Sequence, residues 1–251
     1  LKEVNASAVI FDSRKDLDGL SNTVIESAAN EASSRGLNGK YVIALKNTSG
    51  QPSLSSLKNR SSREKIHKAS LSRGSRGGEF DNREILVNII KLRSEKARLM
   101  GYNNHAAYTL ETQTAQNPQN VNKRLSSLSP KALANAKKEA SDLQKMIESE
   151  GSSFELESWD WDFYTEKVRA ERYNFDANQL KPFFEMNNVL QNGVFFAATK
   201  LFGITFKERF DLPTYHEDIR VFEVFNENGT VLGLFLFDGY ARPTKRGGAW
   251  D

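Results

Sequence analysis

The chain of 251 residues contains no cysteine. This absence excludes a disulfide framework, a thiolate metal site and catalysis by a cysteine nucleophile. No apolar run approaches the roughly 18 residues that a transmembrane helix requires, and no basic segment followed by a short apolar one marks a secretory signal. The sequence therefore indicates a cytoplasmic protein without a membrane partner. A periplasmic protein whose signal segment lies outside this sequence is the alternative.

Histidine is scarce, with only His67, His105 and His216 in the chain. A zinc site of the His-Glu-x-x-His type needs two histidines four residues apart on one helix, so that both rings face one metal beside a glutamate base. None of the three histidines is paired in this way. The run from His216 to Arg220 has arginine at the fifth place and precedes a predicted strand. The sequence therefore predicts no metal ligand in this chain.

Other catalytic patterns are also missing. There is no Gly-x-Ser-x-Gly elbow, and the similar run from Arg73 to Gly77 lacks the strand–turn–helix context of a nucleophile or a phosphate loop. Asp160 and Asp162 stand beside tryptophans, as a carboxylate pair of a glycosidase would. Helix capping by one of them is the simpler interpretation. We therefore assign no catalytic residue to this chain.

The net charge of +3 is unevenly distributed. Residues Lys58 to Arg76 include seven Lys or Arg and one Glu, whereas residues Glu139 to Asp162 include eight Asp or Glu and one Lys. One interpretation is a non-catalytic helical binding module with a basic face for nucleic acid. We favour two solvated helical faces and no nucleic-acid partner, because the basic stretch has no aromatic residue for stacking on bases.

Helical signals cover most of the chain. Asp81 and Glu84 have the spacing of a capping box and precede apolar residues at helical spacing, namely Ile85, Ile89, Leu92 and Leu99. Asn117-Pro118 has the form of an N-cap followed by proline at the first helical position. Ser129-Pro130 repeats this form, which predicts that the helix restarts or kinks there. The sequence predicts a mainly α-helical fold.

β-structure is expected near the C-terminus. The runs 219–225 and 231–237 are rich in β-forming residues and flank Asn228-Gly229, a strong hairpin signal. The first run alternates between two faces, whereas the second is apolar on both. We predict one small antiparallel sheet within residues 204–250. Tyr41–Leu45 is an isolated strand candidate.

A family resemblance appears directly after this hairpin. The residues Asp238-x-Tyr-x-Arg-x-x-Lys-Arg-Gly-Gly-Ala-Trp250, preceded by Tyr215-His216, resemble the bacterial peptidyl-dipeptidases (dipeptidyl carboxypeptidases) of the thimet-oligopeptidase family of zinc metallopeptidases. Further stretches with counterparts in that family are Leu99–Tyr102, Asn117–Val121, Trp159–Tyr164 and Leu180–Leu190. Thr112–Gln116 departs from the more charged, Met-containing stretch that is usual in the family.

The resemblance implies the function of a larger parent protein. In that family a His-Glu-x-x-His helix follows some tens of residues later, so residues 1–251 are expected to be one largely helical region of a two-lobed zincin-type oligopeptidase. The parent is expected to be a monomeric peptidase that binds zinc and releases dipeptides from peptide C-termini. An endo-acting oligopeptidase of the same family is the alternative. The fragment itself is expected to bind no zinc and to be inactive.

The candidate substrate-binding residues are Gly247, Gly248, Ala249 and Trp250. Two adjacent glycines allow another backbone to approach closely, and an edge strand can pair with an extended peptide through main-chain hydrogen bonds. In the family that the chain resembles, this stretch lies beside the cleft, which implies a substrate-strand role for Gly248 and Ala249. A glycine turn between two strands is an equally good interpretation from the residues alone.

Overall fold

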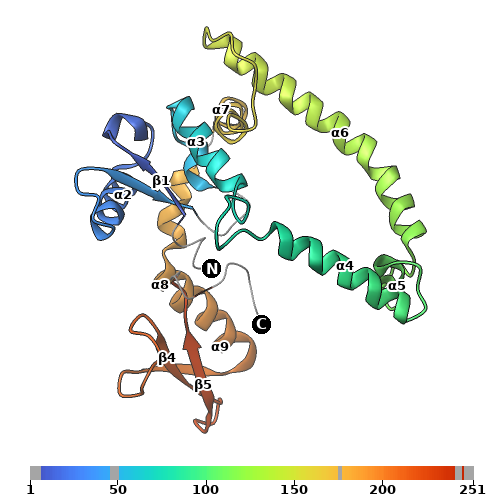
Figure 1. The fold of residues 1–251 in the computed structure, drawn as a ribbon. Coiled ribbons are helices and arrows are strands. Elements are labelled where there is room, and N and C mark those ends of the chain that lie inside the picture. The colour runs from blue at the N-terminus through green and yellow to red at the C-terminus, as the bar shows by residue number, and fades with distance from the viewer. Residues whose placement is uncertain (1–6, 46–50, 175–176, 241–244, 246–251) are drawn as a thin grey trace. The chain divides into compact units, whose positions relative to one another are not determined.

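The computed structural model describes residues 7–45, 51–174, 177–240 and 245. These residues form two compact units (Figure 1), one ending at Tyr173 and the other spanning Asn174–Lys245. The first unit contains β1 (Ala8–Phe11), η1 (Arg14–Leu17), α2 (Asn22–Ser34), β2 (Tyr41–Ala44), η2 (Pro52–Ser55), α3 (Arg60–Leu71), α4 (Arg83–Leu99), α5 (His105–Leu110), α6 (Pro118–Ser149) and α7 (Trp161–Tyr173). The second contains η3 (Ala177–Phe184), α8 (Met186–Asn188), η4 (Val189–Phe195), α9 (Phe196–Phe202), β3 (Thr205–Arg209), β4 (Arg220–Phe225) and β5 (Val231–Phe237).

The predicted fold class is confirmed, because helices dominate and an antiparallel sheet of β3, β4 and β5 lies near the C-terminus. A second, two-stranded sheet forms from β1 and β2, which pair antiparallel. β2 was predicted as a strand from its residues, whereas its partner β1 was not predicted. The prediction that residues 1–251 belong to one larger peptidase domain stays a prediction.

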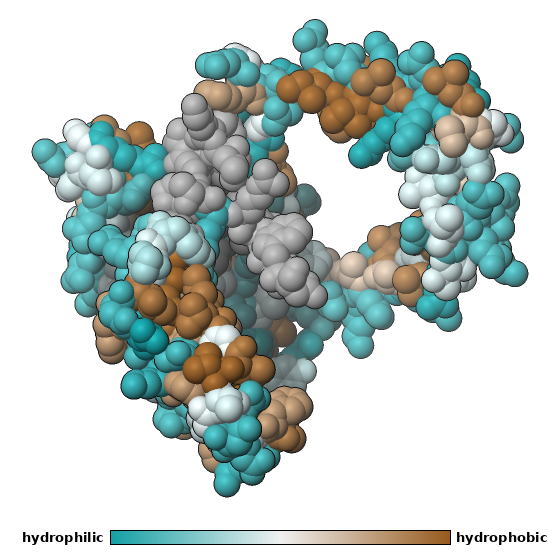
Figure 2. All heavy atoms as spheres, turned by 90° about the horizontal axis from the view of Figure 1, so that it is seen from below, coloured by the Kyte–Doolittle hydropathy of each residue, from teal (hydrophilic) through white to brown (hydrophobic). Residues whose placement is uncertain are grey.

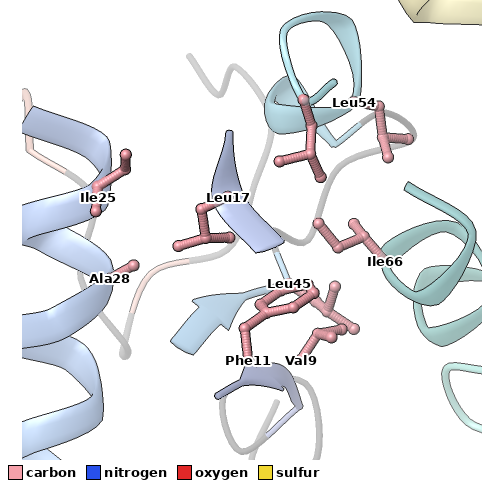
Figure 3. Close-up of a cluster of buried hydrophobic side chains, with 9 residues drawn as sticks. Val9, Phe11, Leu17, Ile25, Ala28, Leu45, Leu54 and Ile66 are labelled. Carbon is pink, nitrogen blue, oxygen red and sulfur yellow. The ribbon is translucent and has the colours of Figure 1, made fainter. Parts of the chain in front are cut away.

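The first unit is organised around a hydrophobic core beneath the two-stranded sheet. Figure 3 shows side chains from β1, α2, η2 and α3 pointing toward one another in this core. The buried members are Val9, Phe11, Leu17, Ile25, Ala28, Leu45, Leu54, Leu57 and Ile66. A smaller cluster of Leu143, Ile147 and Tyr164 joins α6 to α7.

The helix signals are confirmed with two corrections. Asn117 caps α6, since its side-chain oxygen accepts a hydrogen bond from the backbone N–H of Asn120 at 2.9 Å. The predicted restart at Ser129-Pro130 is wrong, because α6 is continuous through Pro130. The sequence predicted Asp81 as the N-cap of α4, but the N-cap residue is Asn82. Asn82 occupies the N-cap position without a side-chain cap bond, and Asp81 accepts from the N–H of Arg83 at 3.0 Å.

Helix α4 carries apolar residues on several sides, and most of them are exposed. Its exposed apolar side chains are Ile85, Leu86, Val87, Ile89, Ile90, Leu92 and Leu99. In α4 only Ala97 is buried. Figure 2 shows hydrophobic patches on the right-hand side, where α4 and α6 lie in Figure 1. None of the helices in the described ranges has both the length and the apolar character needed to cross a membrane.

The second unit is built on the three-stranded sheet, with β4 in the centre. Val221, Phe222 and Val224 of β4 are buried, because they have a strand on each side and helical segments over one face. Phe222 contacts Leu190 and Phe195 of η4 in a small core, and the ring of Phe195 stacks on Phe206 of β3 at 4.0 Å between centroids.

The predicted hairpin between β4 and β5 is confirmed. The conformation of its loop depends on Gly229. The N–H of Gly229 donates to the carbonyl of Asn226 at 2.9 Å, and the N–H of Asn226 donates to the carbonyl of Thr230 at 2.8 Å. Gly229 has φ +80°, in the left-handed region that favours glycine. The connection is therefore a three-residue hairpin loop that ends in a left-handed glycine.

Candidate functional site

The candidate site begins at β5, an outer strand of the three-stranded sheet. One edge of β5 pairs with β4, and the described residues place no strand on its other edge. Its exposed apolar side chains are Val231, Leu232, Leu234, Phe235 and Leu236. An open strand edge with apolar side chains can accept an extended chain through main-chain hydrogen bonds. β5 itself therefore has the geometry of an edge strand, whereas the predicted substrate-binding role of residues 247–250 stays a prediction.

Lys245 binds back to the residues that directly follow β5. The ammonium of Lys245 lies 2.7 Å from a carboxylate oxygen of Asp238. It also donates to the backbone carbonyls of Asp238 at 2.5 Å and of Tyr240 at 2.8 Å. The predicted substrate-binding residues 247–250 start two positions after Lys245, and they lie outside the described residues.

Tyr215, the first residue of the Tyr-His pair that carried part of the resemblance, contacts Asp238. The hydroxyl of Tyr215 donates to the second carboxylate oxygen of Asp238 at 3.1 Å. His216 accepts a hydrogen bond at Nδ1 from the backbone N–H of Asp218 at 3.2 Å. The structure thus brings together four residues of the motif that carries the resemblance, namely Tyr215, Asp238, Tyr240 and Lys245.

The histidines do not form a metal centre. His67 lies in α3 and His105 in α5, whereas His216 lies in the connection before β4. Within the described ranges, no three or more His, Asp or Glu side chains are grouped so that they could hold a metal ion. The described residues, which include all three histidines, therefore do not fit a zinc site, and no step of a reaction is assigned to zinc through them.

Asp160 forms ion pairs with two arginines, which the sequence did not predict. Its carboxylate is fully buried and pairs with Arg60 at 2.8 Å and with Arg63 at 2.7 Å. The hydrogen bond from Arg60 raises the pKa of that guanidinium above its usual value. Asp162 is not part of this cluster and lines a pocket of about 380 Å³ with His67. The glycosidase pairing of Asp160 and Asp162 is therefore not supported.

The contacts of Asp160 also explain the uneven charge. Arg60 and Arg63 belong to the basic stretch, and they bind the acidic segment that precedes α7. Other basic side chains of the stretch have partners within the chain: Lys58 with Asp18, Lys65 with the ring of Phe11, Lys68 with Glu64, Arg73 with the carbonyl of Ser70, and Arg76 with the carbonyl of Ala69. These contacts give the basic residues partners within the chain, and the absence of a nucleic-acid partner stays a prediction.

Comparison with known proteins identifies the family. Residues 53–251 match Peptidase family M3. The chain belongs to this family. It is 40% identical to the dipeptidyl carboxypeptidase of Salmonella typhimurium over 245 residues, which cover 98% of this chain and 36% of the relative. The dipeptidyl carboxypeptidase of Escherichia coli is 39% identical over the same shares of the two chains.

A second group of M3 relatives carries a different name. Oligopeptidase A of Escherichia coli is 35% identical over 239 residues, which cover 94% of this chain and 35% of the relative. The chain thus spans about a third of the length of the curated relatives that it matches. The resemblance to the peptidyl-dipeptidases that rested on Asp238–Trp250 and Tyr215-His216 is confirmed at the level of the family.

Proposed function

We propose that the protein to which this chain belongs is a zinc peptidase that hydrolyses short peptides and releases dipeptides from their C-termini. The observation that supports it best is the identity of 40% over 98% of this chain with a relative named dipeptidyl carboxypeptidase. Relatives named oligopeptidase A match at 35% over 94% of the chain. The difference favours the exo-acting enzyme over the endo-acting alternative.

Residues 1–251 contribute binding groups to this activity and no catalytic group. Among the described residues, no strand pairs with the outer edge of β5, and the glycines of residues 247–250 suit close approach of a peptide backbone. Main-chain pairing does not depend on the substrate's side chains, which suits a peptidase that accepts many short peptides. Gly247, Gly248, Ala249 and Trp250 are the substrate-binding residues of the proposal. Zinc, when bound by the whole protein, would activate the attacking water, and its ligands are assigned to none of the residues described here.

The experiment compares two tetrapeptides with the full-length protein, both blocked at the N-terminus. One has a free C-terminal carboxylate and the other a C-terminal amide. An enzyme that releases C-terminal dipeptides is expected to cleave the first at its middle bond and to leave the second intact, with loss of activity on removal of the metal by a chelator. Internal cleavage of amidated, longer peptides at comparable rates would favour the endo-acting oligopeptidase instead.

The non-catalytic alternative has a test of its own. A nucleic-acid-binding module would bind labelled oligonucleotides with an affinity that falls steeply as salt rises. We expect no binding at low salt, because the basic residues from Lys58 to Arg76 have partners within the chain. A steep salt dependence of measurable binding would revive that alternative.

A further inference from the structure

A pocket lies in the first unit between η2, α3 and the start of α7. Its volume is about 380 Å³, which falls within the roughly 300–1,000 Å³ of sites that bind small molecules. Its walls come from three places in the sequence, namely residues 51–54, 67–71 and 158–162, and all of them belong to the first unit.

The most deeply buried part of the wall is polar and ordered. Gln51 and Ser70 are 3% and 8% exposed, and Gln51 Nε2 donates a hydrogen bond to Ser70 Oγ at 3.2 Å. This bond joins the start of η2 to α3, and Leu54 of η2, another wall residue, is also buried. A wall that is fixed before a ligand enters loses little conformational freedom on binding.

One ring nitrogen of a wall residue lacks a partner. Nε2 of His67 is buried and makes no hydrogen bond within the described ranges. The ring of Trp159 contacts the His67 ring edge-on, with 6.4 Å between the two centroids. Buried polar atoms are usually paired, and leaving one unpaired costs free energy. A polar ligand atom that pairs with Nε2 would remove this cost.

The charge of a suitable ligand is indicated by Asp162. Of the described wall residues it is the only acid, and none of them is Lys or Arg. Asp160 is paired with two arginines, whereas Asp162 is exposed and has no ion-pair partner in the described ranges. The ring of Trp161 belongs to the same wall. A carboxylate and an aromatic ring together favour a cation, through charge-assisted hydrogen bonds and attraction to the ring.

We propose that this pocket binds a small primary amine with an aliphatic side chain, as found at the N-terminal end of a free amino acid or a dipeptide. The ammonium group binds Asp162, and the aliphatic side chain packs against Leu54 and Leu71. The carbonyl oxygen accepts a hydrogen bond from His67, in the tautomer that carries its proton on Nε2. The inference does not depend on the proposed function, because it requires no cleavage of a peptide.

The test titrates leucinamide into the full-length protein and measures the heat of binding. N-acetylleucinamide is the matched probe, since it keeps the aliphatic side chain and the carbonyl but has no ammonium group, and we expect it not to bind. Asp162→Asn is expected to weaken the binding of leucinamide about 10- to 100-fold, because a charged hydrogen-bond partner is lost. Asp18→Asn removes an exposed carboxylate elsewhere in the same unit and is expected to leave the affinity unchanged.

A second variant tests the contact with His67. His67→Phe keeps an aromatic ring beside Trp159 and removes both ring nitrogens. We expect it to weaken the binding of leucinamide about 3- to 10-fold, as for the loss of one hydrogen bond between neutral groups. Isopentylamine has no carbonyl, so it is expected to bind the wild-type protein and His67→Phe equally.

Amide hydrogen exchange locates the ligand on the chain. Exchange of residues 67–71 and 158–162 is expected to slow when leucinamide is added to the wild-type protein or to Asp18→Asn, and to stay unchanged in Asp162→Asn. Slower exchange only outside these residues would place the ligand elsewhere and overturn the proposal.

Two further results would also overturn it: no binding of leucinamide to the wild-type protein, or equal binding by Asp162→Asn. If the proposal holds, titrations with leucine and with leucyl-alanine separate its two sources, because the tighter of the two identifies a free amino acid or a dipeptide. The tetrapeptide assay measures the proposed function separately, so either proposal can fail while the other stands.

Discussion

Among single residues, Asp160 is a buried carboxylate that is paired with two arginines. It is fully buried and holds two arginines of α3, of which Arg63 is 1% exposed. The guanidinium of Arg63 also lies 4.3 Å from the ring centroid of Phe163, and that of Arg60 lies 4.2 Å from the ring centroid of Phe154. A buried charge of this kind is tolerated only because its partner and its hydrogen bonds are present.

Asp160→Asn is therefore expected to destabilise the protein strongly. The variant keeps the shape of the side chain but leaves the charge of Arg63 buried without a counter-ion, a loss of about 3–5 kcal/mol in the free energy of unfolding. Asp18→Asn is the control, because its pair with Lys58 is 3.8 Å long and both side chains are more than half exposed. Urea unfolding of both variants gives the comparison, and equal losses would contradict the role of Asp160.

Glu208 gives the second unit a dependence on pH. Arg220 Nε and Nη2 donate to its two carboxylate oxygens at 2.6 and 2.7 Å, and these bonds lower the pKa of Glu208 below its usual 4.5. Because the pKa is lower in the folded state, the stabilisation is complete above about pH 4.5 and is lost as pH falls through the lowered value.

We expect Glu208→Gln to weaken this pH dependence. The free energy of unfolding of the wild-type protein should fall as pH decreases below 4.5, and the slope should be smaller in the variant. The exposed Glu217 supplies the control, Glu217→Gln. Chemical unfolding at several pH values between neutral and acidic conditions measures the slopes, and parallel curves for wild type and Glu208→Gln would argue against this pair.

The residue scale also shows what sequence patterns can and cannot predict. The cap at Asn117 was predictable because an Asn-Pro start acts within a few residues. The cluster around Asp160 was not, because its arginines lie about 100 positions away in the chain. From its neighbours in the sequence, Asp160 was interpreted as a helix cap or as one of a carboxylate pair. In the structure it pairs with Arg60 and Arg63, which are distant in the sequence.

Among the elements, the β4–β5 hairpin agrees well with its prediction, because the two predicted runs form its strands. Gly229 ends its loop in the left-handed region, and a Cβ at this position would meet nothing within 4 Å. Gly229→Ala should therefore cost only the backbone strain, about 1–2 kcal/mol in the free energy of unfolding. Gly229→Asn should cost less, because asparagine tolerates this conformation.

Gly233 in β5 supplies the matched control for the hairpin. A Cβ there also meets nothing within 4 Å, and its φ is not in the left-handed region. Gly233→Ala is expected to be neutral or slightly stabilising. Thermal unfolding of the three variants should rank Gly229→Ala lowest, and an equal loss from Gly233→Ala would show that the loop conformation is not the cause.

Other elements depart from the structure that their local signals predicted. Proline normally ends a helix because it lacks an N–H and crowds the preceding turn, yet α6 continues through Pro130. The β1–β2 sheet was missed because β1 has four residues and pairs with a strand beyond a complete helix. Short strands acquire their stability from the core beneath them, which periodicity alone does not reveal.

On the scale of the whole molecule, two observations belong together. α4 exposes a large apolar surface, and the relatives that this chain matches are longer than the chain. A helix that is apolar on most sides is typical of the interior of a large protein, and α4 exposes Ile85, Ile90 and Leu99 among others. This chain covers 36% of the dipeptidyl carboxypeptidases that it matches. The proposed activity therefore belongs to a larger assembly of elements than the two units described here.

The distribution of histidines predicts whether residues 1–251 can bind zinc. A catalytic zinc site needs about three protein ligands and an open position for water, and the three histidines of the whole sequence lie in α3, in α5 and before β4. Carboxylates alone favour calcium or magnesium over zinc. We expect purified residues 1–251 to bind no stoichiometric zinc and to release no dipeptides. Metal analysis after dialysis against zinc, beside the tetrapeptide assay, measures both, with the full-length protein as the positive control. Stoichiometric zinc together with peptidase activity in residues 1–251 would require ligands other than the paired histidines on which this argument depends.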